Sequence, residues 1–128
     1  MSLLLDTHAL LWWLENDPRL GKRAHGAISV ANERVVVSAA SAWECAIKVP
    51  TGKLPKAAPV LANFRSILNR EGFDLLDISV EHILAAGALP RFHGDPFDRM
   101  LVAQALAEGM ALVSRDKELD RYGVKRVW

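Results

Sequence analysis

Residues 3–16 read LLLDTHALLWWLEN, and this stretch decides which class of fold the chain can adopt. Residues 3–5 are three leucines, and the run ends at Asp6. A short run with no polar residue is typical of a strand buried on both faces, as in a parallel sheet. Residues 7–16 predict a helix, which Asp17-Pro18 ends. The stretch therefore predicts a buried strand joined directly to a helix.

Apolar strands and helices continue to alternate along the rest of the chain. We expect further strands at residues 35–37, 73–78, 110–113 and 124–128. We expect further helices at residues 20–32, 38–49, 60–70, 79–89, 96–108 and 116–121, with a loop at 53–58. This alternation is typical of an α/β fold. We therefore predict a single domain over residues 1–128, with a central parallel sheet of about five strands and helices on both faces.

The composition limits the classes of protein that the sequence can encode. Sixteen Lys and Arg stand against fifteen Asp and Glu, which gives a net charge of +1, and 51% of the residues are hydrophobic. The apolar fraction excludes a disordered chain, and the balanced charge excludes a polycation that holds nucleic acid by charge alone. The single cysteine, Cys45, excludes an internal disulfide and a cysteine zinc cluster.

The sequence also indicates where the protein acts. No basic leader precedes the first apolar run, so we expect no signal peptide. The longest unbroken apolar run, residues 9–14, is far shorter than the roughly 20 residues that span a bilayer. We therefore expect a cytoplasmic protein that makes no membrane contact.

Acidic residues stand where a parallel sheet binds its ligands, beyond the carboxyl ends of the strands. Asp6 follows the first predicted strand and Asp116 follows the fourth, while Asp98 lies in the first turn of the helix before the fourth strand. Asp95 precedes Pro96 and begins that helix. Each acid also has a purely structural interpretation, because carboxylates commonly cap helix N-termini.

Glu44 is unusual because it lies within an apolar stretch, where an unpaired carboxylate is costly. Lys48 offers it an i,i+4 ion pair worth only about 0.3–0.5 kcal/mol, which is the structural alternative. If Glu44 meets Asp6, Asp98 and Asp116, two carboxylates about 5 Å apart repel by roughly 3 kcal/mol at an effective dielectric constant of about 20. A divalent cation would relieve this repulsion, and oxygen ligands favour Mg²⁺ or Mn²⁺. Such a metal activates water for phosphodiester cleavage.

Four segments, in this order, resemble those of PIN-domain ribonucleases of the VapC toxin type. They are LLDTHALLW at 4–12, SAASAWECAIK at 38–48 with GKL at 52–54, HGDPFDRMLVAQA at 93–105, and SRD at 114–116 with YGV at 122–124. The resemblance covers nearly the whole chain.

The resemblance implies a PIN fold and a toxin that cleaves RNA with Mg²⁺ or Mn²⁺. It assigns the catalytic metal site to Asp6, Glu44, Asp98 and Asp116, and accessory positions to Asp95 and Ser114. Thr7 and Arg99 directly adjoin implied ligands, and we include them as accessory residues. The resemblance further implies a VapB-type antitoxin as partner and a homodimer.

Several alternatives remain open in the sequence. His8 and His93 lack metal-ligand spacing, so they either contact substrate or have a structural role. The basic residues Lys48, Lys53, Lys56, Arg91, Arg99 and Arg115 either follow an RNA backbone or form a solvated surface; Arg99 and Arg115 touch phosphate or brace a carboxylate. The helix that contains residues 9–14 is apolar all round, so its second face meets either another helix or a partner. A receiver-like Mg²⁺-binding signalling domain and a non-catalytic binding module are the rival functions.

Overall fold

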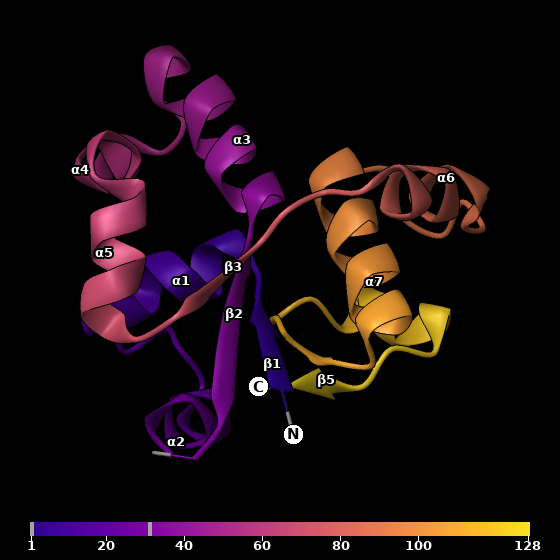
Figure 1. The fold of residues 1–128 in the computed structure, drawn as a ribbon, viewed down its shortest axis with the longest axis horizontal. Coiled ribbons are helices and arrows are strands. Elements are labelled where there is room, and N and C mark those ends of the chain that lie inside the picture. The colour runs from indigo at the N-terminus through magenta and orange to yellow at the C-terminus, as the bar shows by residue number, and fades with distance from the viewer. Residues whose placement is uncertain (1, 31) are drawn as a thin grey trace.

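The computed structural model describes residues 2–30 and 32–128, which contain a five-stranded parallel sheet (Figure 1). The strands are β1 (Ser2–Leu5), β2 (Arg34–Ser38), β3 (Asp74–Leu76), β4 (Ala111–Val113) and β5 (Arg126–Val127). Their order is β3-β2-β1-β4-β5, and each neighbouring pair is parallel. The predicted α/β class and parallel sheet are confirmed.

Helices cover both faces of this sheet, as predicted. The α-helices are α1 (Thr7–Leu14), α2 (Lys22–Ser29), α3 (Ala39–Lys48), α4 (Ala58–Ala62), α5 (Phe64–Glu71), α6 (Val80–Ala88) and α7 (Pro96–Glu108), and the 3₁₀ turns are η1 (Val49–Thr51), η2 (Pro55–Ala57) and η3 (Lys117–Tyr122). Leu3 and Leu5 of β1 pack with residues of α1, α2 and α5, whereas Leu4 packs with residues of α3 and α7. Successive side chains of a strand point to opposite faces, so one apolar run supplies two cores.

The first helix, α1, is buried on two sides. Leu10 joins the core on one face of the sheet. Leu11 belongs to a separate cluster with Cys45, Ala57 and Val60. The second apolar face of α1 therefore meets α3 and the segment formed by η2 and α4, which is the first of the two alternatives expected for this helix.

Some predicted elements have different limits in the structure. The helix predicted at 60–70 is divided into α4 and α5, because Asn63 leaves the helical backbone conformation at φ −129° and ψ 33°. The helix predicted at 20–32 spans only α2, and part of that prediction, Ala31, lies outside the described residues. Just before α2, Trp128 packs closely against Gly21, where a Cβ would lie 2.9 Å from it. The predicted helix at 116–121 is the 3₁₀ turn η3.

The strand order places a topological switch point between β1 and β4. From β1 the chain builds β2 and β3 on one side, and it then returns to form β4 on the other side of β1. The connections that leave β1 and β4 therefore diverge, which opens a crevice at the carboxyl ends of these two strands. Asp6 directly follows β1, and Ser114 directly follows β4. Across the described residues, no helix has the length and apolar character needed to cross a membrane.

Candidate metal centre

A cavity of about 330 Å³ opens at the switch point between β1 and β4. It is lined by Asp6, His8, Trp12, Asp98, Ser114, Arg115 and Asp116. Three of the acids singled out in the sequence therefore converge on one cavity from three distant parts of the chain. Glu44, the fourth, is not among the lining residues. We call this hollow the acidic cavity.

Asp6 combines a capping role with a place in the acidic cavity. Its backbone N–H donates to the carbonyl of Val113 at 3.0 Å, which ties the residue to β4. Its carboxylate accepts a hydrogen bond from the backbone N–H of Ala9 at 2.8 Å and so caps α1. The pKa of Asp6 is raised by burial, although the hydrogen bonds from Ala9 and Ser114 act in the opposite direction. Both interpretations of Asp6 thus have a physical basis.

Asp98 lies in the first turn of α7, and Asp95 fixes where that helix begins. The carboxylate of Asp95 accepts hydrogen bonds from the backbone N–H groups of Phe97 and Asp98 at 2.8 and 3.3 Å. The pKa of Asp98 is raised to about 7, first by burial and then by the negative charges of Asp95 and Asp6. Near neutral pH, Asp98 is therefore only partly ionised.

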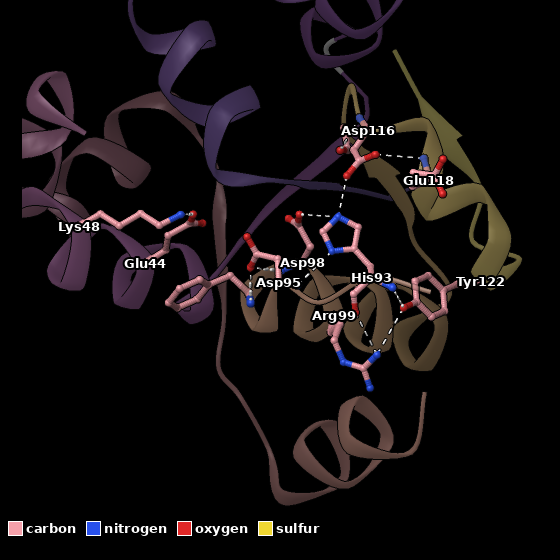
Figure 2. A network of polar contacts seen from close by, with 11 residues as sticks. Glu44, Lys48, His93, Asp95, Asp98, Arg99, Asp116, Glu118 and Tyr122 are labelled. Atoms are coloured by element: carbon pink, nitrogen blue, oxygen red, sulfur yellow. Dashed lines mark hydrogen bonds and ion pairs between the residues drawn. The ribbon is translucent and has the colours of Figure 1, made fainter. Parts of the chain in front are cut away.

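Asp116 begins η3 and is bound by a histidine. Its Oδ1 accepts from the backbone N–H of Glu118 at 3.0 Å, and its Oδ2 lies 2.8 Å from Nε2 of His93. Nδ1 of His93 accepts from the backbone N–H of Asp95 at 3.1 Å, so the proton of a neutral ring is on Nε2. His93 therefore donates to Asp116, and Asp98 Oδ2 lies 3.5 Å from the same nitrogen (Figure 2).

Glu44 lies beside the acidic cavity, on α3, with its carboxylate held by two neighbours. Oε1 accepts a hydrogen bond from the Thr7 hydroxyl at 2.6 Å, and Oε2 pairs with the ammonium group of Lys48. The i,i+4 pair expected from the sequence is therefore present. The charge of Glu44 still raises the pKa values of Asp6 and Asp98, so these three acids form one electrostatic group. Figure 2 shows Glu44 and Lys48 on one side of Asp98 and Asp116 on the other.

The remaining accessory residues differ in what they contact. Ser114 is fully buried, and its hydroxyl accepts from the backbone N–H of Asp116 at 3.2 Å. Thr7 lies 3.0 Å from the Ser41 hydroxyl as well as binding Glu44. These hydroxyl groups hold the acids in place.

Arg99 does not line the acidic cavity, and among residues 2–30 and 32–128 its guanidinium pairs with no carboxylate, contrary to both expectations for it. The structure buries its guanidinium, which donates to the carbonyls of Ala86, Leu89, Pro90 and His93 and to the Tyr122 hydroxyl. The side chain turns instead to the end of α6 and the loop between α6 and α7, because this segment presents several carbonyl groups to it. Arg99 therefore holds the loop that carries His93.

His93 is the residue that sequence reasoning undervalued. The spacing that indicates a histidine metal site requires a pair of histidines, whereas His93 acts alone. The informative pattern was its place two residues before the helix cap Asp95, because this brings a ring nitrogen to the cap's own N–H. Cys45, in contrast, is a core residue as expected, and burial raises the pKa of its thiol to about 11.

The groups that line the acidic cavity suit a hard divalent cation. One ligand atom each of His93, Asp98 and Asp116 lies within 4.8 Å of the other two. Burial and mutual repulsion raise the pKa values of Asp6 and Asp98, and a bound cation would compensate the same negative charges. Carboxylate oxygens are the donors that such cations prefer. Asp6, Asp98 and Asp116 would supply them, with Glu44 close by.

A parallel sheet with acids gathered at the β1–β4 switch point defines a class of protein. The chain matches the PIN domain family over residues 3–125, and it belongs to this family. It is similar to Ribonuclease VapC22 of Mycobacterium tuberculosis, with 34% identity over 119 residues that cover 92% of this chain and 89% of that protein.

Two solved structures share the fold. VapBC2 from Rickettsia felis, bound to a DNA fragment from its promoter, aligns with a TM-score of 0.68 and 16% identity over 98% of this chain and 97% of that one. FitAcB from Neisseria gonorrhoeae aligns with a TM-score of 0.69 and 18% identity over 97% of this chain and 95% of that one. The TM-scores establish a common fold, and at these low identities they establish the fold alone.

Proposed function

We propose that this protein is a divalent-metal-dependent endoribonuclease, the toxin of a toxin–antitoxin pair, with Mg²⁺ or Mn²⁺ as its cofactor. The observation that carries the proposal is the convergence of Asp6, Asp98 and Asp116 on one cavity in a PIN domain. Identity of 34% with a ribonuclease over most of both chains supports RNA as the substrate.

The carboxylates of Asp6, Asp98 and Asp116 would hold the cation, and Glu44 adds negative charge beside them. When bound, such a cation supplies an activated water and offsets negative charge on the phosphate. Asp98, whose pKa is about 7, would have to be deprotonated to hold the cation. His93 keeps Asp116 oriented through Nε2–H. Arg115 places a guanidinium at the wall of the acidic cavity, where it can attract the phosphate of the substrate.

We further propose that residues 1–128 act as a single PIN domain in the cytoplasm, as a homodimer bound by a VapB-type antitoxin. Complexes between such toxins and antitoxins are among the structures that share its fold, which supports the partner. The chain also has apolar side chains to bury against partners: Trp43, Ile83 and Leu84 are all more than half exposed.

The test is RNA cleavage by the purified protein with Mn²⁺ or Mg²⁺, compared with its Asp98→Asn variant. We expect cleavage that EDTA abolishes and that Asp98→Asn reduces by at least about 100-fold, because a ligand oxygen is lost. Sequencing the new RNA ends would identify the cleaved bonds. Equal activity of the two proteins would refute the assigned site. Absence of Mn²⁺ binding by calorimetry would favour a non-catalytic binding module, and labelling by a small phosphodonor would favour the receiver-like alternative.

A further inference from the structure

A second hollow, of about 260 Å³, adjoins the acidic cavity. The two share His8 and Trp12 in their walls, so they lie side by side along α1. The second hollow is otherwise lined by the end of α1, the turn after it and residues 53–57, before α4. We call it the basic pocket, for the side chains that line it.

The basic pocket has a net positive charge. Arg19, Lys53 and Lys56 line it, with Glu15 as the acidic member of its wall. Glu15 pairs with Lys56 at 3.3 Å, and Arg19 pairs with Asp17 at 2.8 Å.

Lys53 accounts for the positive charge of the basic pocket that these two ion pairs do not neutralise. Within residues 2–30 and 32–128, no carboxylate lies within ion-pair distance of its exposed ammonium group. Three cations therefore face two carboxylates, and within the described chain Lys53 is the one of the three without an ion-pair partner.

Trp12 connects the basic pocket to the acidic cavity. Only 5% of Trp12 is exposed, because His8 and Trp128 pack against it at ring-centroid distances of 5.3 and 5.8 Å. Two guanidinium groups, those of Arg19 and Arg115, each lie 4.9 Å from the centre of its ring. Arg115 lines the acidic cavity and Arg19 lines the basic pocket. Trp12 is thus too enclosed to stack with a base, and instead it holds one cation at each hollow.

An RNA substrate would require basic groups close to the acidic cavity. The carboxylates of the cavity repel the phosphates on either side of the bond to be cleaved, since a bound cation compensates the carboxylate charge only locally. Attraction for the strand must therefore come from basic groups next to the cavity, and phosphate contacts dominate the affinity of proteins for nucleic acids. Among the hollows that adjoin the acidic cavity, the one on the far side of Trp12 provides these groups.

We propose that the basic pocket binds the phosphate of the nucleotide next to the cleaved bond, with Lys53 and Arg19 as its ligands; this rests on the proposed ribonuclease function. Arg115 binds the strand at the wall of the acidic cavity, and Arg19 binds it one step further along. His8, which is exposed between the two hollows, lies where the intervening sugar or base passes. The occupant is a single strand, because separate cations spaced along two adjoining hollows follow a flexible backbone.

The test compares Lys53→Ala with a matched control, Lys125→Ala. Both lysines are exposed, but Lys125 adjoins β5 and lines neither hollow. Fluorescence anisotropy would measure binding of a labelled random-sequence RNA of about 12 nucleotides, in EDTA and in an Asp98→Asn background that prevents cleavage. We expect Lys53→Ala to weaken binding about fivefold and to lower the salt slope by about one, whereas Lys125→Ala changes neither. Arg19→Met, which keeps an apolar contact for Trp12, should act in the same direction.

Cleavage kinetics provide the second measurement. Lys53→Ala should raise KM and leave kcat unchanged, because Lys53 touches the flanking nucleotide and not the bond that breaks. Equal effects of Lys53→Ala and Lys125→Ala would overturn the proposal, as would a loss confined to binding of the antitoxin. If the wild-type protein cleaves no RNA, the proposed function fails, and the anisotropy result still decides whether the basic pocket holds an RNA strand.

Discussion

Nε2 of His93 donates a hydrogen bond to Oδ2 of Asp116 at 2.8 Å, while Nδ1 of the same ring accepts from the backbone N–H of Asp95. The ring thus links the cap of α7 to the cap of η3. Because one nitrogen must accept and the other must donate, the neutral ring has a single compatible tautomer. Its Nε2–H group also lies next to two carboxylates that we propose as metal ligands.

The tautomer of His93 can be measured by ¹⁵N NMR. In the metal-free protein above pH 8, the two-bond ¹H–¹⁵N pattern of His93 should be that of the Nε2–H form. Added Mg²⁺ should shift these resonances, because the cation competes for the oxygens that His93 binds, and His25, an exposed residue of α2, should not respond. A dominant Nδ1–H form would contradict the hydrogen-bond pattern described here.

The raised pKa of Asp98 predicts how stability depends on pH. Its pKa is about 7 in the folded protein against an ordinary value of 3.8, so folding favours the protonated form. The free energy of unfolding of the metal-free protein should therefore fall as pH rises from about 4 through about 7. Asp98→Asn lacks this loss, so it should be more stable than wild type above pH 7, by an amount on the order of 1–3 kcal/mol, with no difference below about pH 4. Thermal unfolding in EDTA across this range is the measurement.

A control for this prediction is Asp120→Asn. The hydrogen bond from Arg126 lowers the pKa of Asp120, so its ionised form is favoured in the folded state. Asp120→Asn should not stabilise the protein at any pH. Stabilisation by both variants would mean that the effect is general to removing acids and is not caused by the crowding around Asp98.

The effects of substituting Glu44 and Lys48 on the free energy of unfolding should be strongly non-additive. The Glu44 side chain is 7% exposed, and Lys48→Met removes its cation. Within the described chain, the buried charge that remains accepts a hydrogen bond from the Thr7 hydroxyl alone. We expect Lys48→Met to cost about 1–3 kcal/mol in urea unfolding. Adding Glu44→Gln should recover most of this loss, because an amide needs no counter-charge. A Lys48→Met variant as stable as wild type would show that the pair adds nothing.

Replacing Arg99 should lower the stability of the protein and loosen the loop before α7. Its guanidinium satisfies four carbonyls and one hydroxyl, and a lysine ammonium with three donors cannot match that geometry. Arg99→Lys should lower the free energy of unfolding by about 2 kcal/mol or more and speed amide exchange in residues 86–93. Arg91→Lys, at an exposed position in the same loop, is the matched control. Unchanged exchange in this loop would exclude a positioning role for Arg99.

The sheet could be predicted well because the sequence patterns that indicate strands are local. The three central strands, β1, β2 and β4, are mostly apolar runs next to a helix, and Asp6 and Asp95 lie at the helix starts that their residue types favour. Positions after strand ends then pointed to Asp6 and Asp116. What decides that these two meet is the strand order, with β4 beside β1, and no local pattern encodes which strands are neighbours.

Long-range contacts also explain what the sequence did not predict. Arg99 follows Asp98 directly, so proximity along the chain suggested a place in the site, but its side chain turns to the loop before α7. Gly21, which precedes α2, leaves room for Trp128, more than a hundred residues later. His93 was undervalued for the same reason, since its partner Asp116 is 23 residues away.

Three of the acids at or beside the cavity, Asp6, Asp95 and Asp116, also accept a hydrogen bond from the first turn of the helix or 3₁₀ turn that each begins. Asparagine caps a helix about as well as aspartate does, yet it brings no negative charge for a cation. A change from Asp to Asn needs a single base transition in the codon. If Asp6 and Asp116 hold the cation as proposed, Asp6→Asn or Asp116→Asn would silence the enzyme and still keep its helix caps, so a cell burdened by an active toxin would have a short mutational escape that preserves the folded chain.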